Sequence, residues 1–414
     1  MPELDLEFVR AQFPAFSEPS LAGQAFFENA GGSYACGQVI DRLTRFYRQR
    51  KVQPYAPYAA SRLGGAEMDE GRARLAELLG VEGDELLVGP STSQNTYVLA
   101  QAFRQMLAPG DALVVTDQDH EANSGVWRRL AEGGVEVREW RVDPASGHLD
   151  PAGLAALLDG RVRLVAFPHC SNIVGETNDV AALVAMVHDA GAVACVDGVS
   201  HAPHGLPDVG ALGADVYLFS SYKTYGPHQG VMVVRRSLAE ALPNQGHWFN
   251  AGIAAKRLTP AGPDHAQVAA LAGVADYVEA LDRRHFPGEP AGLRQASARV
   301  RGLMRAHETR LLQPLLDWAA ARNDVRLVGP ADAGRRVPTV SMVCAQPGAA
   351  VAAALAPHGV MAGGGDFYAV RLLQALGIEP DHGVLRLSFV HYTSAAEVGQ
   401  AIAGLDAVLD APRD

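Results

Sequence analysis

The sequence predicts an α/β fold: a mostly parallel, seven-stranded sheet between helices, followed by a smaller C-terminal α+β domain. Between about residues 80 and 236, short β-rich runs alternate with stretches of helical spacing. This alternation is typical of parallel strands joined by crossover helices. After residue 236 it gives way to an irregular segment rich in glycine and proline, then to two long helical patterns. At about 150 residues per domain, a chain of 414 residues is expected to form two or three domains.

The first part of the chain contains seven expected strands, most of them separated by helical stretches. The runs VRLVAFP (162–168) and GAVACV (191–196) are apolar except at Arg163, as expected for central strands buried on both faces. The last run follows too soon for a crossover helix, so we expect it to be antiparallel. In chain order the runs are DELLVG (84–89), ALVVTD (112–117), VEVREWRV (135–142), VRLVAFP (162–168), GAVACVD (191–197), ADVYLFS (214–220) and GVMVVRR (230–236).

The second part is expected to be the smaller domain. The boundary is placed in RHFPGEPAG (284–292), where proline and glycine interrupt the helical pattern. We therefore expect a large domain over 31–285 and a small domain over 286–414. The expected elements are helices at 266–283 and 292–322, strands VRLVGP (325–330) and VPTVSMV (337–343), a helix at 349–359, a glycine-rich turn at 363–366, a helix at 367–377, a strand at 384–392 and a helix from Ser394.

Composition excludes several classes of protein. The net charge of −11 argues against a nucleic-acid or anionic-membrane binder. The four cysteines are far apart and form no CxxC pair, so a reducing compartment is expected and a disulfide framework is not. The N-terminus carries acids where a signal peptide needs bases, and no apolar run reaches the ~18 residues of a membrane span. We expect a soluble, cytoplasmic protein.

Polar side chains follow several expected strands at the point where each strand ends. In open α/β sheets, ligands bind at the carboxyl ends of the strands. These side chains are therefore expected to gather at one edge of the sheet. They are Ser91, Thr92 and Ser93 after the first strand, the stretch 118–121 after the second, 169–172 after the fourth, Asp197 to His201 after the fifth, and 220–223 after the sixth.

Three positions at this edge each allow two interpretations. The hydroxyls of 91–93 begin a helix, where they either cap it or help to bind an anion. Asp197 ends an apolar strand, and its carboxylate either caps the next helix or pairs with a cation such as a cofactor ring nitrogen. Lys223 is either an exposed loop lysine or, in a partly desolvated site, an amine nucleophile. The chain has only three lysines, which favours the chemical interpretation of Lys223.

Metal and nucleotide sites are less favoured alternatives. His201 and His204 have HxxH spacing, and His169, Cys170 and Cys195 lie at neighbouring strand ends. No HExxH or CxxC motif accompanies them, so we expect no metal. The first strand is followed by no GxGxxG, and no GxxxxGK[ST] occurs, which argues against nicotinamide and nucleoside triphosphate cofactors.

The segment Phe219–Pro227, FSSYKTYGP, resembles the S-x-H-K-x-Y-G-P signature of pyridoxal-phosphate enzymes of fold type I in the class V aminotransferase family. This family includes cysteine desulfurases and selenocysteine lyases. The resemblance extends from FFENAG (26–31) to Arg386 and beyond, and the spacing from Asp197 to Lys223 fits it. It implies pyridoxal 5′-phosphate as the cofactor, and an N-terminal segment (1–30) packed near the active site and the small domain.

The resemblance assigns a role to each matching residue. Lys223 would bind the cofactor as an aldimine and move the Cα proton of an α-amino acid. Asp197 would pair with the ring nitrogen, His120 would stack on the ring, and Asn172 would lie near the ring hydroxyl. Arg386 would hold the substrate carboxylate, with Asn29 beside it in the N-terminal substrate segment. The remaining cofactor-binding residues would be Ser91, Thr92, Ser93, Ser200 and Ser220, with His265 in a loop (260–265) that reaches the phosphate of the neighbouring subunit in a homodimer.

The sequence also departs from the family. Desulfurases carry a nucleophilic cysteine in a small-domain loop, and the matching stretch here, 363–368, is GGGDFY. Tyr222 stands before the lysine where desulfurases often have histidine, Ser200 stands where a glutamine is common, and Pro263 stands where a hydroxyl residue is common in the loop toward the neighbouring phosphate. The resemblance is therefore to a divergent branch of the family.

Two classes of function remain open. The first is an enzyme acting on an α-amino acid. Either β-elimination of sulfur or selenium without a persulfide cysteine, or transamination, would follow Cα deprotonation, and hydrolytic cleavage is a weaker third possibility. The missing loop cysteine fits both elimination without sulfur capture and transamination, and of the two we favour the lyase. The second is a non-catalytic binding protein that keeps the fold. Retention of Lys223, Asp197, His120 and Arg386 together argues against it.

Overall fold

The seven expected strands form one sheet in the computed structural model, which describes residues 2–411. The strand order is β2-β8-β7-β6-β5-β3-β4. β8 is antiparallel to both of its neighbours and the other strands are parallel. The predicted α/β class and the antiparallel strand are confirmed. The bounds are β2 Leu86–Gly89, β3 Ala112–Thr116, β4 Glu136–Trp140, β5 Val162–Pro168, β6 Val193–Asp197, β7 Val216–Ser220 and β8 Gly230–Val234.

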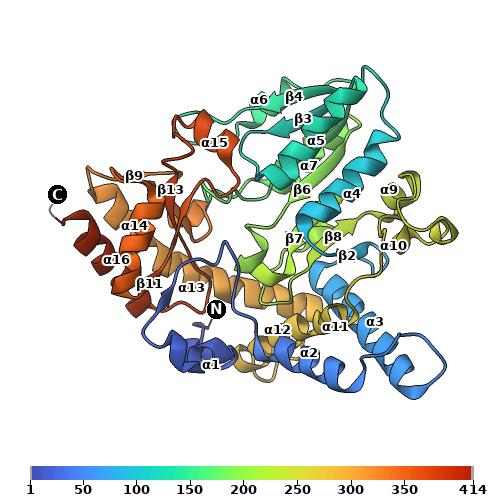
Figure 1. Ribbon diagram of the computed structural model, residues 1–414, viewed down its shortest axis with the longest axis horizontal. Helices are drawn as coiled ribbons and strands as arrows, with labels where there is room; N and C mark the ends of the chain where they lie inside the picture. Colours follow the sequence, from blue (N-terminus) through green and yellow to red (C-terminus); the bar gives the residue numbers. More distant parts are fainter. Residues whose placement is uncertain (1, 412–414) are drawn as a thin grey trace.

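Helices cover both faces of this sheet (Figure 1). Alternate side chains of each strand point to opposite faces. Leu113 and Val115 of β3 pack with α4 (Thr92–Arg104) and α5 (Glu121–Arg128). Ala112 and Val114 belong to the core on the other side, which includes α7 (Val180–Asp189), α3 (Ala59–Leu79) and α12 (Ala272–His285). Burial on both faces explains the apolar runs of the central strands.

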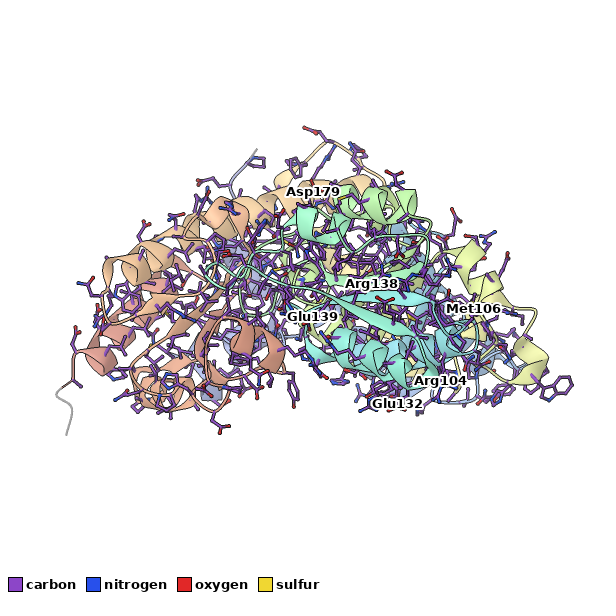
Figure 2. All side chains as sticks on the ribbon, turned by 90° about the horizontal axis from the view of Figure 1, so that it is seen from above. Arg104, Met106, Glu132, Arg138, Glu139 and Asp179 are labelled. Carbon is purple, nitrogen blue, oxygen red and sulfur yellow. The ribbon has the colours of Figure 1, made fainter. Side chains whose placement is uncertain are left out.

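A second, antiparallel sheet lies beside the first (Figures 1 and 2). Its order is β12-β13-β10-β9, with bounds Gly363–Gly365, Val384–Ser388, Thr339–Val343 and Arg326–Leu327. The long helix α13 (Leu293–Ala321), α14 (Gly348–Leu355) and α16 (Ala395–Leu409) share one hydrophobic core with it. Near the N-terminus, β1 (Ala25–Phe26) pairs in parallel with β11 (Val360–Met361), and Glu28 bridges Ser388.

Three details differ from the expected elements. The glycine-rich stretch predicted as a turn is strand β12. Its glycines serve close packing: a Cβ at Gly364 would lie 2.1 Å from the Gly348 backbone, and only glycine permits that approach. The helix expected from residue 367 begins at Val370 as α15 (Val370–Ala375), after Phe367 and Tyr368, whose φ angles are +50° and +57°. The helix expected at 266–283 is divided into α11 (His265–Ala270) and α12.

The helices give no sign of a membrane-spanning segment. Within residues 2–411, none combines the length and apolar character that crossing a bilayer requires.

Candidate active site

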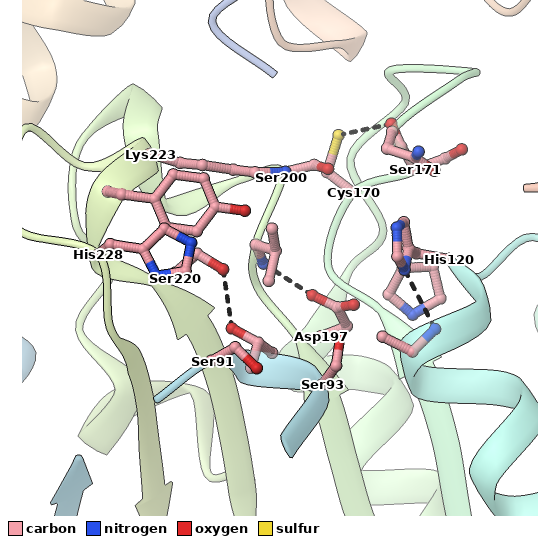
Figure 3. Close-up of a pocket in the computed structure, with 16 residues that line it drawn as sticks. Ser91, Ser93, His120, Cys170, Ser171, Asp197, Ser200, Ser220, Lys223 and His228 are labelled. Atoms are coloured by element: carbon pink, nitrogen blue, oxygen red, sulfur yellow. Dashed lines mark hydrogen bonds between the residues drawn. The ribbon is translucent and has the colours of Figure 1, made fainter. Parts of the chain in front are cut away.

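The side chains predicted to gather at one sheet edge surround a cavity of about 620 Å³, including its open mouth (Figure 3). The carboxyl ends of β5, β6 and β7 and the N-termini of α4 and α5 form its walls. This is the edge at which open α/β sheets bind ligands. Nine predicted residues line the cavity: Ser91, Thr92, Ser93, His120, Asn172, Asp197, Ser200, Ser220 and Lys223.

The N-terminus of α4 forms a cradle suited to an anion. Ser91 is the N-cap residue, and its side chain accepts the Gln94 N–H at 3.2 Å. Thr92 Oγ1 and Ser220 Oγ lie 2.8 Å apart and join the helix to the end of β7. The first N–H groups of a helix have no carbonyl one turn earlier and attract negative charge. Ser91 thus caps the helix, while the neighbouring N–H groups and hydroxyls fit a phosphate.

Asp197 is a buried carboxylate at the end of β6. Its Oδ1 accepts the Val199 N–H at 2.8 Å (Figure 3). Burial raises the pKa of Asp197 to about 6, and Lys223 opposes that rise. Because burial disfavours the charged form, a cation placed against Asp197 would stabilise the carboxylate. A protonated ring nitrogen fits this position.

Lys223 follows β7 in a short 3-10 turn, Ser221–Lys223. Burial lowers its pKa to about 8, the positive charge of Arg386 adds to the effect, and Asp197 and Glu28 oppose it. An ordinary lysine has a pKa near 10.5. At neutral pH Lys223 therefore supplies far more of the neutral amine, the form that attacks a carbonyl.

His120 is the residue immediately before α5. Its Nδ1 accepts the Ala122 N–H at 3.1 Å, so the neutral ring carries its proton on Nε2. Burial lowers the pKa of His120 to about 4, with further contributions from Lys223 and Arg386. A neutral imidazole is therefore available to lie against an aromatic ring in the cavity.

Arg386 lies in the middle of β13 and is 3% exposed. Its Nη2 donates to Glu28 Oε1 at 2.7 Å, and its Nη1 donates to the Asn172 carbonyl at 3.4 Å. The Phe367 ring covers the guanidinium at 3.7 Å. Asn172 Nδ2 donates to the Phe367 carbonyl at 3.0 Å. Asn172 therefore links the cavity wall to Arg386 and to the turn that covers it.

Three predicted residues do not line the cavity: Arg386, which reaches its wall through Asn172, and Asn29 and His265, which lie elsewhere. Asn29 is buried beside β13, where its Oδ1 accepts the Tyr392 hydroxyl and its Nδ2 donates to the Ser388 carbonyl at 3.4 Å. His265 begins α11 and lines a second, larger hollow with Lys256 and Arg72. Substrate contact by Asn29, and a role for His265 at the phosphate of a neighbouring subunit, stay predictions.

One wall of the cavity is formed by two stacked rings. Tyr222 and His228 stack with ring centroids 4.5 Å apart and planes 6° apart. Tyr222 precedes the lysine, and His228 follows Gly226 and Pro227 after the same strand. Tyr222 belongs to the stretch 220–223 that was expected at this edge, whereas His228 was not named, and its place shortly after the same strand is the signal that could have marked it as a cavity residue.

The cysteines and the HxxH pair take other positions. All four cysteines are buried and free. Burial raises the pKa to about 12 at Cys36 and Cys170, to about 11 at Cys344, and well above its ordinary value at Cys195. His201 stacks on His169 at 3.6 Å, and His204 Nδ1 lies 2.9 Å from Glu308 Oε2. Across the described residues, no three His, Cys, Asp or Glu side chains are grouped to hold a metal ion.

The fold and the cavity define an enzyme that depends on pyridoxal phosphate: a lysine with a lowered pKa, a buried aspartate that suits a cationic ring nitrogen, and a phosphate cradle at a helix N-terminus. The chain matches the model of the aminotransferase class-V family over residues 25–282. It belongs to that family. Class V aminotransferases and cysteine desulfurases are pyridoxal-phosphate-dependent.

Relatives and solved structures agree with this assignment. The chain is 34% identical to an "Aminotransferase-like protein FGM3" of Gibberella zeae, over 98% of both chains. It is 29% identical to a cysteine desulfurase of Pectobacterium atrosepticum, over 97% of this chain and 98% of the relative. Its fold is similar to that of the cysteine desulfurase CsdA of Escherichia coli (TM-score 0.82, 24% identity, 99% of each chain covered). It is also similar to that of a cysteine desulfurase of Thermococcus onnurineus (TM-score 0.85, 22% identity, 99% of each chain covered).

Proposed function

We propose that this enzyme is a lyase that cleaves a Cβ–S or Cβ–Se bond of an α-amino acid by β-elimination. The observation that carries the proposal is the position of Lys223, which lines one cavity with Asp197. The pKa of Lys223 is lowered by burial and by the positive charge of Arg386. The similarity to cysteine desulfurases over almost the whole chain supports a sulfur or selenium leaving group.

Each residue of the cavity has a distinct task in this proposal. The cradle of Ser91, Thr92, Ser93 and Ser220 holds the phosphate, with Ser200 beside it. Asp197 pairs with the ring nitrogen, His120 covers one ring face, and Asn172 lies near the ring hydroxyl. Bound pyridoxal phosphate supplies an electron sink for the carbanion at Cα. Arg386 orients the substrate carboxylate, and Lys223 Nζ removes the Cα proton.

The proposed elimination needs no sulfur-accepting cysteine. When the Cα–H and Cβ–S bonds break, Lys223 holds the proton and the leaving group departs with the electron pair of the Cβ–S bond. The remaining three-carbon unit takes up water and leaves as a keto acid and ammonium. Cys170 is the cysteine that lines the cavity, and its thiol donates to the Gly175 carbonyl at 3.1 Å. With a pKa of about 12, Cys170 stays a thiol rather than a nucleophilic thiolate.

Transamination is the second candidate function. It is favoured by the aminotransferase-like relative at 34% identity and by the same Lys223, which can return the proton to the cofactor side instead of expelling a leaving group. The two functions differ in their need for a second substrate, because a transaminase requires a keto-acid acceptor to complete its cycle.

The decisive experiment mixes the cofactor-loaded protein with a panel of amino acids and no keto-acid acceptor. Visible spectra and keto-acid release are followed together. Many turnovers of keto acid, with the starting spectrum restored, would support elimination, and the responding amino acid would identify the leaving group. One turnover that ends in the pyridoxamine spectrum would support transamination. A protein that stays colourless with added pyridoxal phosphate would favour a non-catalytic scaffold.

We also propose that the enzyme acts as a homodimer. Exposed apolar side chains lie near the hollow that contains His265: Trp248 is 84% exposed and Phe249 is 65% exposed. Large exposed apolar groups mark interaction surfaces, and a second copy on this surface would bring the 260–265 segment toward the neighbouring site. Sedimentation equilibrium tests this, and a monomer at micromolar concentration would contradict it.

A further inference from the structure

The arginine proposed to bind the substrate carboxylate is already paired with a carboxylate of this chain. Glu28 Oε1 accepts a hydrogen bond from Arg386 Nη2 at 2.7 Å. The arginine side chain is 3% exposed and the glutamate side chain is 29% exposed. A substrate that uses Arg386 must therefore compete with Glu28, which occupies the same guanidinium.

Two glycines make room for this glutamate. A Cβ at Gly363 would lie 2.3 Å from Glu28 Oε2, and a Cβ at Gly31 would lie 2.8 Å from Glu28 Oε1. Gly363 is also the residue of β12 that pairs with Arg386. Any larger residue at position 363 would therefore force the carboxylate of Glu28 to move.

The pairing leaves hydrogen-bonding capacity unused. Glu28 Oε2 and Arg386 Nε are both buried, and neither has a hydrogen-bond partner among the described residues. A guanidinium and a carboxylate can form two parallel hydrogen bonds, but here a single one forms. A free carboxylate can approach the guanidinium in the two-bond geometry, so it can gain more from Arg386 than Glu28 does.

Glu28 is the partner that can move. Arg386 is held between β10 and β12, by the Asn172 carbonyl and by the Phe367 ring. The backbone of Glu28 is fixed as well, through its bridge to Ser388 and the Gly31 N–H, which donates to its carbonyl at 2.9 Å. Its side chain, however, is partly exposed to solvent. Rotation about the side-chain bonds of Glu28 can therefore move the carboxylate away from Arg386.

We propose that Glu28 is a displaceable internal carboxylate that competes with the substrate carboxylate for Arg386. It neutralises the buried arginine while the substrate site is empty. A ligand must therefore bind Arg386 strongly enough to displace Glu28, and carboxylates that bind weakly are excluded. Glu28 is a specificity-determining residue in this proposal, which rests on the proposed function of Arg386 as the carboxylate site.

The test measures binding of propionate to the cofactor-loaded protein. Propionate carries a carboxylate but no amino group, so its binding does not depend on turnover. Titration calorimetry compares the wild type with Glu28→Gln, which keeps the shape and removes the charge. The matched control is Glu121→Gln, a glutamate near the mouth whose side chain is 49% exposed and contacts Arg371.

Propionate should bind Glu28→Gln about ten-fold more tightly than the wild type, because it then displaces a neutral amide oxygen from Arg386 instead of a more strongly bound carboxylate. The control should stay within about two-fold, as expected for an exposed pair. In the Arg386→Met background, Glu28→Gln should not increase the affinity for propionate. Melting temperatures verify that each variant is folded.

An unchanged or weaker affinity of Glu28→Gln would overturn the proposal, and so would equal gains in Glu28→Gln and Glu121→Gln. Failure of propionate to bind either protein would overturn it too. Failure of the proposed function is distinguishable, because it concerns turnover. Tighter propionate binding without turnover of any amino acid would keep the role of Glu28 and refute the lyase and transaminase hypotheses. Turnover of an amino acid with unchanged propionate affinity in Glu28→Gln would keep the proposed enzyme activity and refute the role of Glu28.

Discussion

The two sides of the cavity are built in different ways. On the cofactor side, Thr92, His120 and Lys223 each follow a strand of one sheet within a few residues, and Asp197 is the last residue of another strand. The proposed substrate side adjoins the cavity through Asn172: there Arg386 bonds Glu28, which is 358 residues away in the sequence, and the Phe367 ring covers Arg386.

The fold therefore determines the position of the cofactor-side residues, whereas it leaves the substrate-side residues free to vary. The topology of a parallel sheet brings every strand end to one edge, so the cofactor side follows from the fold itself. The substrate side depends on contacts between three distant segments. Changes there can alter substrate choice without disturbing the sheet, and variants on the two sides should therefore have different effects.

The largest effect is expected from Lys223→Ala on the cofactor side. Without the amine, the covalent link to the cofactor cannot form, and turnover should fall by a factor of at least about 10³, as expected for loss of a positioned acid–base group. Borohydride reduction followed by mass spectrometry detects the link. The control is Lys51→Ala, which removes an exposed lysine beside the Tyr47 ring and should retain the link. A reducible link that persists at another residue in Lys223→Ala would refute the assignment.

The next largest effect is expected from Arg386→Ala on the substrate side. Charge-assisted hydrogen bonds to the substrate carboxylate contribute about 1.5–3 kcal/mol, so KM should rise by roughly ten- to a hundred-fold. Arg386→Lys keeps the charge but loses the two-bond geometry, so its KM should lie between those of the wild type and Arg386→Ala. Steady-state kinetics with the responding amino acid checks the order. Equal KM values for all three proteins would show that the carboxylate binds elsewhere.

The sequence predicted the cofactor side more fully than the substrate side. Strand ends are visible as apolar runs that stop at polar residues, and nine residues named on that basis and by family resemblance line the cavity. Arg386 was named by resemblance, but its partner Glu28 was not. No local pattern connects residues so far apart, and their contact depends on how β1, β11 and β13 pair.

Two of the three differences in the fold also lie on the substrate side. Gly363–Gly365 looked like a turn because glycine is common in turns, yet the close approach of α14 to β12 requires glycine there. Phe367 and Tyr368 have positive φ angles, which aromatic residues rarely adopt. The helical pattern of the stretch 367–377 extended the expected helix to these two positions. The Asn172 and Asp366 side chains, which bond the Phe367 carbonyl and the Tyr368 N–H, oppose it.

A smaller effect, on the pH dependence of cofactor capture, tests the electrostatics of the cofactor side. The pKa of Lys223 is lowered to about 8, so the reactive neutral amine should increase through the range around pH 8 rather than around 10.5. His120, with a pKa of about 4, is already neutral there and should contribute no transition. The rate at which the apo-protein takes up pyridoxal phosphate, measured by absorbance, should therefore rise with a midpoint near pH 8. A midpoint near that of an ordinary lysine would contradict the desolvated site.

The smallest effect is expected from the cysteines, and it decides whether sulfur passes through the protein. Replacing Cys36, Cys170, Cys195 and Cys344 with alanine one at a time removes buried thiols whose raised pKa values keep them protonated. Turnover should stay within about two-fold for each variant, since a protonated thiol is a poor nucleophile. Melting temperatures separate loss of packing from loss of chemistry. Loss of sulfur release in a stable, cofactor-loaded Cys36→Ala or Cys170→Ala variant would instead assign that cysteine a role in sulfur transfer, and would make the enzyme a desulfurase with a relocated acceptor.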